Sequence, residues 1–123
     1  MLKNAAFGSL CFLIGMTTFA LAQTQSEMNQ EARTDLEIAD AELNKVYKAL
    51  RSKLSDDEKN RLKEVQLSWL KYRDKNAEFE ASLYEGGSIA PMVHAGSLTT
   101  STVLRTEQLK GMFREGYEEA PLP

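Results

Sequence analysis

The chain has 123 residues, with 15 basic and 18 acidic side chains and a formal net charge of −3. This length suits one small domain with one core, and the acidic balance favours a cationic protein over nucleic acid as a partner. Cys11 and His94 are the only cysteine and histidine, which excludes zinc or haem sites built on thiolates and metal sites built on a histidine cluster. We therefore expect no metal and no other cofactor.

The first 22 residues have the pattern of a secretory signal peptide. Lys3 is their only charged residue, residues 5–22 are almost wholly apolar, and the stretch ends in Ala20-Leu21-Ala22. This pattern predicts cleavage before Gln23 and a periplasmic or secreted protein that is not held at a membrane. The alternative is an uncleaved anchor, because the apolar run is near the ~20 residues that a helix needs to cross a bilayer.

Cleavage would leave 101 residues with 14 basic and 18 acidic side chains, no cysteine and a formal net charge of −4.

An amphipathic helix is predicted over residues 28–54, since apolar residues recur there at steps of three and four. These residues are Met28, Ala32, Leu36, Ala39, Leu43, Tyr47, Leu50 and Leu54. Ser55 followed by Glu58 is a capping box, which predicts that a second helix begins at Ser55. So short a connection predicts an antiparallel hairpin.

The second helix should end at Gly86-Gly87, because glycine readily takes the left-handed conformation found just past helix ends. Its apolar positions are Leu62, Val65, Trp69, Tyr72, Phe79 and Leu83. Ser88 is expected to cap a third helix that has Pro91 in its first turn. The inward positions of this helix are Met92, Ala95, Leu98, Thr102, Arg105, Leu109 and Met112. We predict an all-α, up-down-up three-helix bundle over residues 23–114, followed by a frayed tail over residues 115–123.

Polar side chains occupy inward-facing positions in each predicted helix. We call the following set the polar layer: Asp40, Asn44, Gln66, Trp69, Arg73 and Arg105. A buried charge costs several kcal/mol unless it is paired, so the two arginines need an acid, and Asp40 is the best placed. Asp74 points about 100° away from Arg73 and is expected nearer the surface. We interpret the layer as structural, with a ligand site as the alternative.

Four ordered segments resemble the N-terminal domain of the LprI lysozyme inhibitor family. They are ADAELNKVY at 39–47, VQLSWLKYRD at 65–74, GGS at 86–88 and LTTSTVLRTEQL at 98–109. The resemblance spans residues 28–109 and implies an exported helical protein, in some members an inhibitor of lysozyme, with no catalytic residue to carry over. It therefore implies a binding protein and not an enzyme.

The sequence departs from the family at three positions where relatives carry cysteine, which here hold Glu31, Ala77 and Ser97. A disulfide in a small domain is typically worth about 2–4 kcal/mol. Without it, the fold must rest on its core and polar layer. The departure also leaves room for a changed partner.

Two classes of function stay open on the sequence. In the first, the protein occludes a cationic cell-wall-cleaving enzyme such as lysozyme, because opposite charges speed and orient the encounter. In the second, it is an envelope stress or scaffold domain without a lysozyme target, in an oligomeric state that the sequence leaves undecided. The exposed turn at Gly86, Gly87 and Ser88 is the expected contact region, with a simple helix end and helix start as the alternative.

Overall fold

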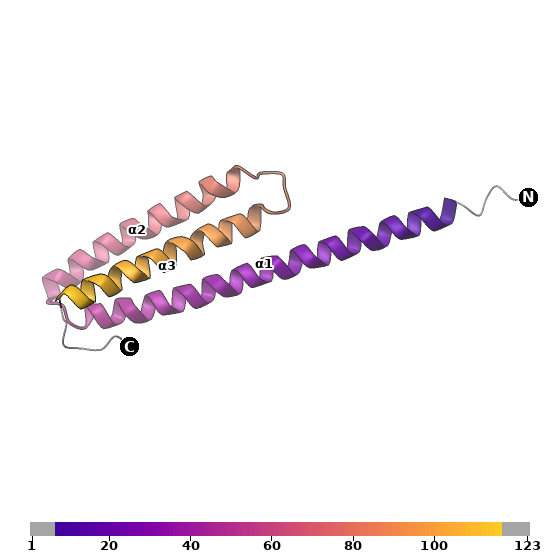
Figure 1. The fold of residues 1–123 in the computed structure, drawn as a ribbon. Coiled ribbons are helices and arrows are strands. Elements are labelled where there is room, and N and C mark those ends of the chain that lie inside the picture. The colour runs from indigo at the N-terminus through magenta and orange to yellow at the C-terminus, as the bar shows by residue number, and fades with distance from the viewer. Residues whose placement is uncertain (1–6, 117–123) are drawn as a thin grey trace, which may run out of the picture.

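The computed structural model describes residues 7–116, with side chains from residue 21 onward. It contains three helices, α1 (Phe7–Arg51), α2 (Asp56–Ser82) and α3 (Ala90–Gly116), which run up, down and up (Figure 1). No strand occurs within the described range, and the predicted all-α, three-helix fold is confirmed. Of the predicted tail, residues 115 and 116 belong to α3, and the remainder lies outside the described residues.

Helix α1 is continuous from Phe7 to Arg51 and therefore begins well before the predicted start at residue 28. The expected cleavage site between Ala22 and Gln23 lies inside this helix, and cleavage stays a prediction. The N-terminal half of α1 extends past the turn that joins α2 to α3 (Figure 1). Within residues 7–116, no helix has an apolar stretch long enough to cross a membrane.

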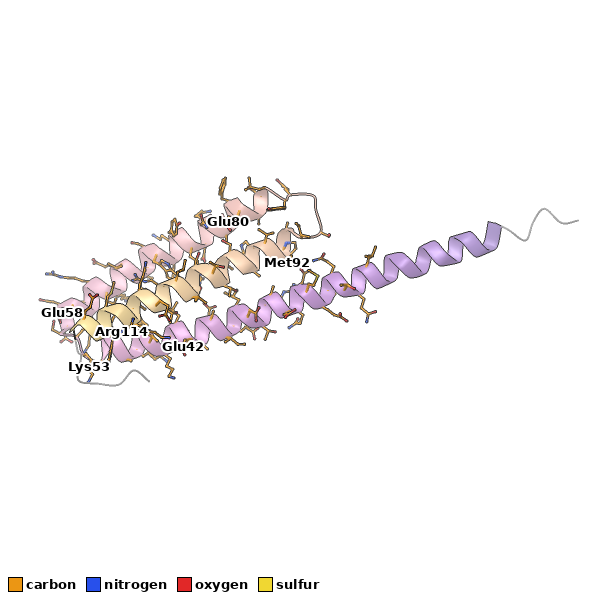
Figure 2. All side chains as sticks on the ribbon, in the orientation of Figure 1. Glu42, Lys53, Glu58, Glu80, Met92 and Arg114 are labelled. Carbon is orange, nitrogen blue, oxygen red and sulfur yellow. The ribbon has the colours of Figure 1, made fainter. Side chains whose placement is uncertain are left out.

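The junction between α1 and α2 is the predicted capping box. The Ser55 backbone N–H donates to Glu58 Oε2 at 2.8 Å, and the Glu58 N–H donates to Ser55 Oγ at 3.4 Å. These two bonds satisfy backbone donors that a helix start leaves without an intrahelical partner. Glu58 and Lys53 mark this end of the molecule in Figure 2.

The second junction differs in part from its prediction. Helix α2 ends at Ser82 with Leu83 as its cap, earlier than the predicted end at Gly86-Gly87. Gly86 still takes the left-handed conformation, with a φ of +82°, but in the turn that follows, where the Gly87 N–H donates to the Tyr84 carbonyl at 3.0 Å. The expected cap at Ser88 is wrong. The Val93 N–H donates to the Ile89 carbonyl at 3.0 Å, so Ile89 occupies the position before the first helical residue, and Ser88 lies one residue too early to cap α3.

The helices do not share contacts equally. Helix α3 lies between α1 and α2 and packs against both, whereas α1 and α2 make few close contacts with each other (Figure 1). The buried core joins α1 to α3 and consists of Leu43, Val46, Leu50, Leu109 and Phe113. Leu54, Leu62 and Trp69 pack against it from the first turn and from α2. The connection between α1 and α2 is a hairpin, but both helices bury their apolar faces against α3.

Several positions predicted to be buried are exposed. On α2 these are Val65 at 52%, Tyr72 at 64% and Phe79 at 62% exposure, and Leu83, just after α2, is 67% exposed. A helix with one neighbour buries a narrower stripe than a helix enclosed by two neighbours, and α2 packs mainly against α3. Met28 and Met112 are also exposed, at 39% and 46%.

Candidate functional site

Arg73 is the centre of the polar layer and links all three helices. Its Nη1 lies 3.2 Å from Asp40 Oδ1 on α1 and 3.3 Å from Thr102 Oγ1 on α3. Its Nε donates to Asp74 Oδ1 at 2.9 Å, and its guanidinium lies 5.3 Å from the centre of the Trp69 ring, within range of a cation–π interaction. The expected pairing with Asp40 is present. Asp74 is nearer the surface, as expected, yet it also pairs with Arg73.

Arg105 does not join this ion pair, which corrects the expectation that Asp40 serves both arginines. Its Nε donates to Gln66 Oε1 at 3.0 Å, and its Nη1 donates to Gln108 Oε1 at 3.1 Å. Arg105 is 6% exposed, its burial lowers its pKa, and its Nη2 has no hydrogen-bond partner among the described side chains and backbone. The buried guanidinium is therefore compensated by two amide oxygens, because its position on α3 faces Gln66 and not Asp40.

Asn44 of the polar layer and Asn76, one turn beyond Arg73 on α2, have different surroundings. Asn44 is exposed, so it does not belong to a buried layer. Asn76 is partly buried and donates to Glu80 Oε1 at 2.7 Å and to Ser97 Oγ at 3.4 Å. Ser97 and Ala77, at two of the positions where the resemblance implied cysteine, are buried. Small side chains thus fill the space near the contact of α2 with α3.

A groove of about 350 Å³ lies between α1 and α2, where these helices fail to pack against each other. Its lining combines polar-layer residues with apolar side chains: Asp40, Leu43, Asn44, Tyr47, Lys63, Gln66, Leu67, Leu70 and Arg73. Sequence reasoning missed Lys63, Leu67 and Leu70. Their spacing of four and three residues was the available signal, since it places them on one side of α2, beside the polar-layer residues of that helix. The groove offers hydrogen-bonding groups of both charges, and it makes part of the polar layer accessible from outside.

The turn at Gly86, Gly87 and Ser88 is exposed. The backbone at position 86 has a φ of +82°, a conformation that favours glycine, and a Cβ at position 87 would lie 3.2 Å from the Tyr84 carbonyl oxygen. The two glycines thus have a conformational reason to be there. Ser88 lines a shallow hollow together with residues of α1, which are Leu21, Ala22, Gln25, Ser26 and Asn29.

Comparison with known proteins gives one family and one relative. Residues 19–109 match the family described as lysozyme inhibitor LprI. The chain is also similar to an uncharacterised protein of Rhizobium meliloti, with 33% identity over 105 residues, which cover 75% of this chain and 76% of that protein. No solved structure matches the chain.

Proposed function

The chain belongs to the LprI lysozyme inhibitor family, and we propose that it is an exported binding protein which occludes a cationic, cell-wall-cleaving enzyme of the lysozyme type. The family match carries this proposal, since it spans residues 19–109 and so covers most of the described chain. In this proposal the protein covers the enzyme's surface and catalyses no reaction.

Charge supports the proposal. The chain beyond residue 22 has a formal net charge of −4, from 14 basic and 18 acidic side chains. A cationic enzyme is attracted to such a surface, and the attraction both speeds the encounter and orients it. This effect acts mainly on the rate of association, while the contacts at the interface decide how long the complex lasts.

The contact region that we propose is the end of the three-helix bundle at Gly86, Gly87 and Ser88. The turn is exposed, and Ser88 shares a hollow with α1, so two separate segments form one surface there. Ser88→Trp should weaken inhibition without loss of helicity. Ser52→Trp, which places the same bulk in the exposed turn at the opposite end, should leave inhibition unchanged.

A scaffold domain without an enzyme target is the second candidate, and one observation favours it. Val65, Tyr72 and Phe79 follow one another at steps of seven residues along α2, and each is more than half exposed. Exposed apolar strips of this kind often mark protein–protein contacts, including self-association. An oligomer built through α2 would be consistent with a structural role in the cell envelope.

The deciding experiment mixes the protein exported by a bacterial host with a C-type lysozyme and measures cell-wall lysis and complex formation. We expect slower lysis and a stable complex. Mass spectrometry of the same sample should find an N-terminus at Gln23, and a chain that retains residues 1–22 would contradict the assignment to an exported, released protein. Should the folded protein leave lysis unchanged at high micromolar concentration, the inhibitor proposal fails and the scaffold role replaces it.

A further inference from the structure

A second groove of about 350 Å³ lies between α1 and α3, on a different pair of helices from the first groove, which lies between α1 and α2. Its lining comes from Met28, Glu31, Ala32 and Asp35 on α1 and from Met92, Gly96, Thr99 and Thr100 on α3. Met92 lies near the start of α3 (Figure 2). The groove adjoins the hollow at Ser88 along α1, because the lining of the hollow reaches Asn29 and that of the groove includes Met28. Both therefore belong to the end of the three-helix bundle where we place the contact region.

The two acids of this groove are four residues apart and therefore lie on one face of α1. Both are exposed, and neither forms a salt bridge among residues 21–116. Like charges at this spacing repel each other within a helix, so the pair destabilises α1, and a bound cation would reduce this repulsion. The segment 27–42 contains six acidic residues and one basic residue. Its net charge of −5 exceeds that of the chain beyond residue 22, so the acidity of the protein is concentrated here.

The rest of the lining is apolar or small and suits the stem of a long side chain. Met28 and Met92 lie on opposite helices, and methionine is flexible and polarisable enough to adapt to a guest. Gly96 keeps the α3 side open, because a Cβ there would meet nothing within 4 Å. Lysine and arginine have this form, an apolar stem with a charged end that a carboxylate can bind.

We propose that the groove formed by Met28, Glu31, Ala32, Asp35, Met92, Gly96, Thr99 and Thr100 receives a lysine or arginine side chain from a cationic partner protein. The inference rests on the proposed function, in which the partner is a cationic enzyme, and it names where that partner docks. Charge selects the occupant. The lining contains two carboxylates and no basic residue, whereas Lys63 and Arg73 both line the groove between α1 and α2.

The first test fills the groove. Gly96→Leu places a side chain in open space within the groove, and Gly111→Leu places the same side chain in open space fifteen residues further along α3. We expect Gly96→Leu to weaken binding of a C-type lysozyme about tenfold, the loss typical of removing one good contact. Gly111→Leu should bind as the wild type does. Equal binding by both variants, each shown to be helical by circular dichroism, overturns the proposal.

The second test removes the charge without changing the shape. Glu31→Gln combined with Asp35→Asn should weaken binding about as strongly as Gly96→Leu. The control, Glu37→Gln combined with Glu64→Gln, changes the net charge by the same amount at exposed positions that do not line the groove. A loss of equal size in both double variants shows that only overall charge matters, and it refutes a groove-specific contact.

A third measurement separates this proposal from the proposed function. A fluorescent hexalysine peptide should bind the wild type and lose affinity in the Gly96→Leu variant, even if no lysozyme is inhibited. In that case the groove proposal stands and the lysozyme proposal fails. If lysozyme is inhibited equally by the wild type and by every groove variant, the groove proposal fails and the proposed function stands. If the wild type binds neither hexalysine nor lysozyme, the groove proposal is overturned.

Discussion

Asp40 and Arg73 form an ion pair between α1 and α2, two helices that otherwise make few close contacts. Asp40 Oδ1 lies 3.2 Å from Arg73 Nη1, and the same nitrogen donates to Thr102 on α3. The side chain of Arg73 is 14% exposed, whereas that of Asp40 is 43% exposed. Water therefore screens the acid, and the pair contributes less than a fully buried one would.

Arg73→Ala should lower the free energy of unfolding by roughly 1–3 kcal/mol, through loss of the ion pair, of the bond to Thr102 and of the contact with Trp69. Breaking a fully buried pair costs about 3–5 kcal/mol, but here Asp40 regains water. Urea denaturation measures the change. Lys71→Ala, at an exposed position two residues away, should change stability by less than about 0.5 kcal/mol. If Arg73→Ala is as stable as the wild type yet no longer binds a partner, Arg73 belongs to a binding site.

Arg105→Met should change stability by less than about 1 kcal/mol, because a buried arginine without a carboxylate can be replaced by an apolar side chain of similar size at little cost. Gln108 is exposed and can bond to water once Arg105 is gone, while Gln66 loses one partner. Arg73→Met, with the same change of residue, should be clearly less stable. If Arg105→Met instead unfolds at the lower temperature, Arg105 contributes more to stability than Arg73 does.

The stabilising contribution of Glu58 should be lost in acid. Its carboxylate accepts hydrogen bonds from the Ser55 backbone N–H and side chain, and these bonds hold its pKa below its usual value of 4.5. Because the pKa is lowered in the folded state, the contribution is fully present above that usual value and is lost as pH falls through the lowered one. Glu58→Gln keeps a capping residue but cannot ionise. The difference in unfolding free energy between the two proteins should therefore shrink with acid, and a constant difference contradicts the prediction.

Two glycine substitutions should have opposite effects. Gly86→Ala forces a side chain into a backbone with φ of +82° and should destabilise the protein by roughly 1 kcal/mol. Gly96→Ala adds a methyl group in open space within α3 and should stabilise it by roughly 1 kcal/mol, because alanine is the better helix former. Thermal melts of the two variants provide the comparison. A drop for Gly96→Ala would mean that the α1–α3 groove closes in solution.

Salt should slow association with a cationic enzyme more than it speeds dissociation. The screening length falls from about 10 Å at 0.1 M salt to about 3 Å at 1 M, which removes long-range attraction first. Contacts within an interface are screened less, so the dissociation rate should change little. Stopped-flow or surface-based kinetics with lysozyme distinguishes the two rates. Association that does not respond to salt would show that charge plays no part in the encounter.

Local patterns in the sequence were sufficient to predict three helices and the start of α2, although not every helix boundary. The serine and glutamate at positions 55 and 58 identify the start of α2, because a capping box needs only residues that are neighbours in the chain. Gly86 identifies the turn after α2 for the same reason, since its conformation depends on its own missing side chain. The four ordered segments that resemble the LprI family also predicted membership of it, and the match over residues 19–109 confirms this prediction.

Only the tertiary structure decided which faces meet. Periodicity shows that Val65, Tyr72 and Phe79 share a side of α2, but burial requires a neighbour, and α3 lies against a different side. Arg105 pairs with amides because α3 turns it toward Gln66. Glu31 and Met92 line the same groove between α1 and α3, and no local sequence pattern relates residues so far apart in the chain. Helix formation depends on near neighbours, whereas partners, exposure and grooves depend on how the helices are placed against one another.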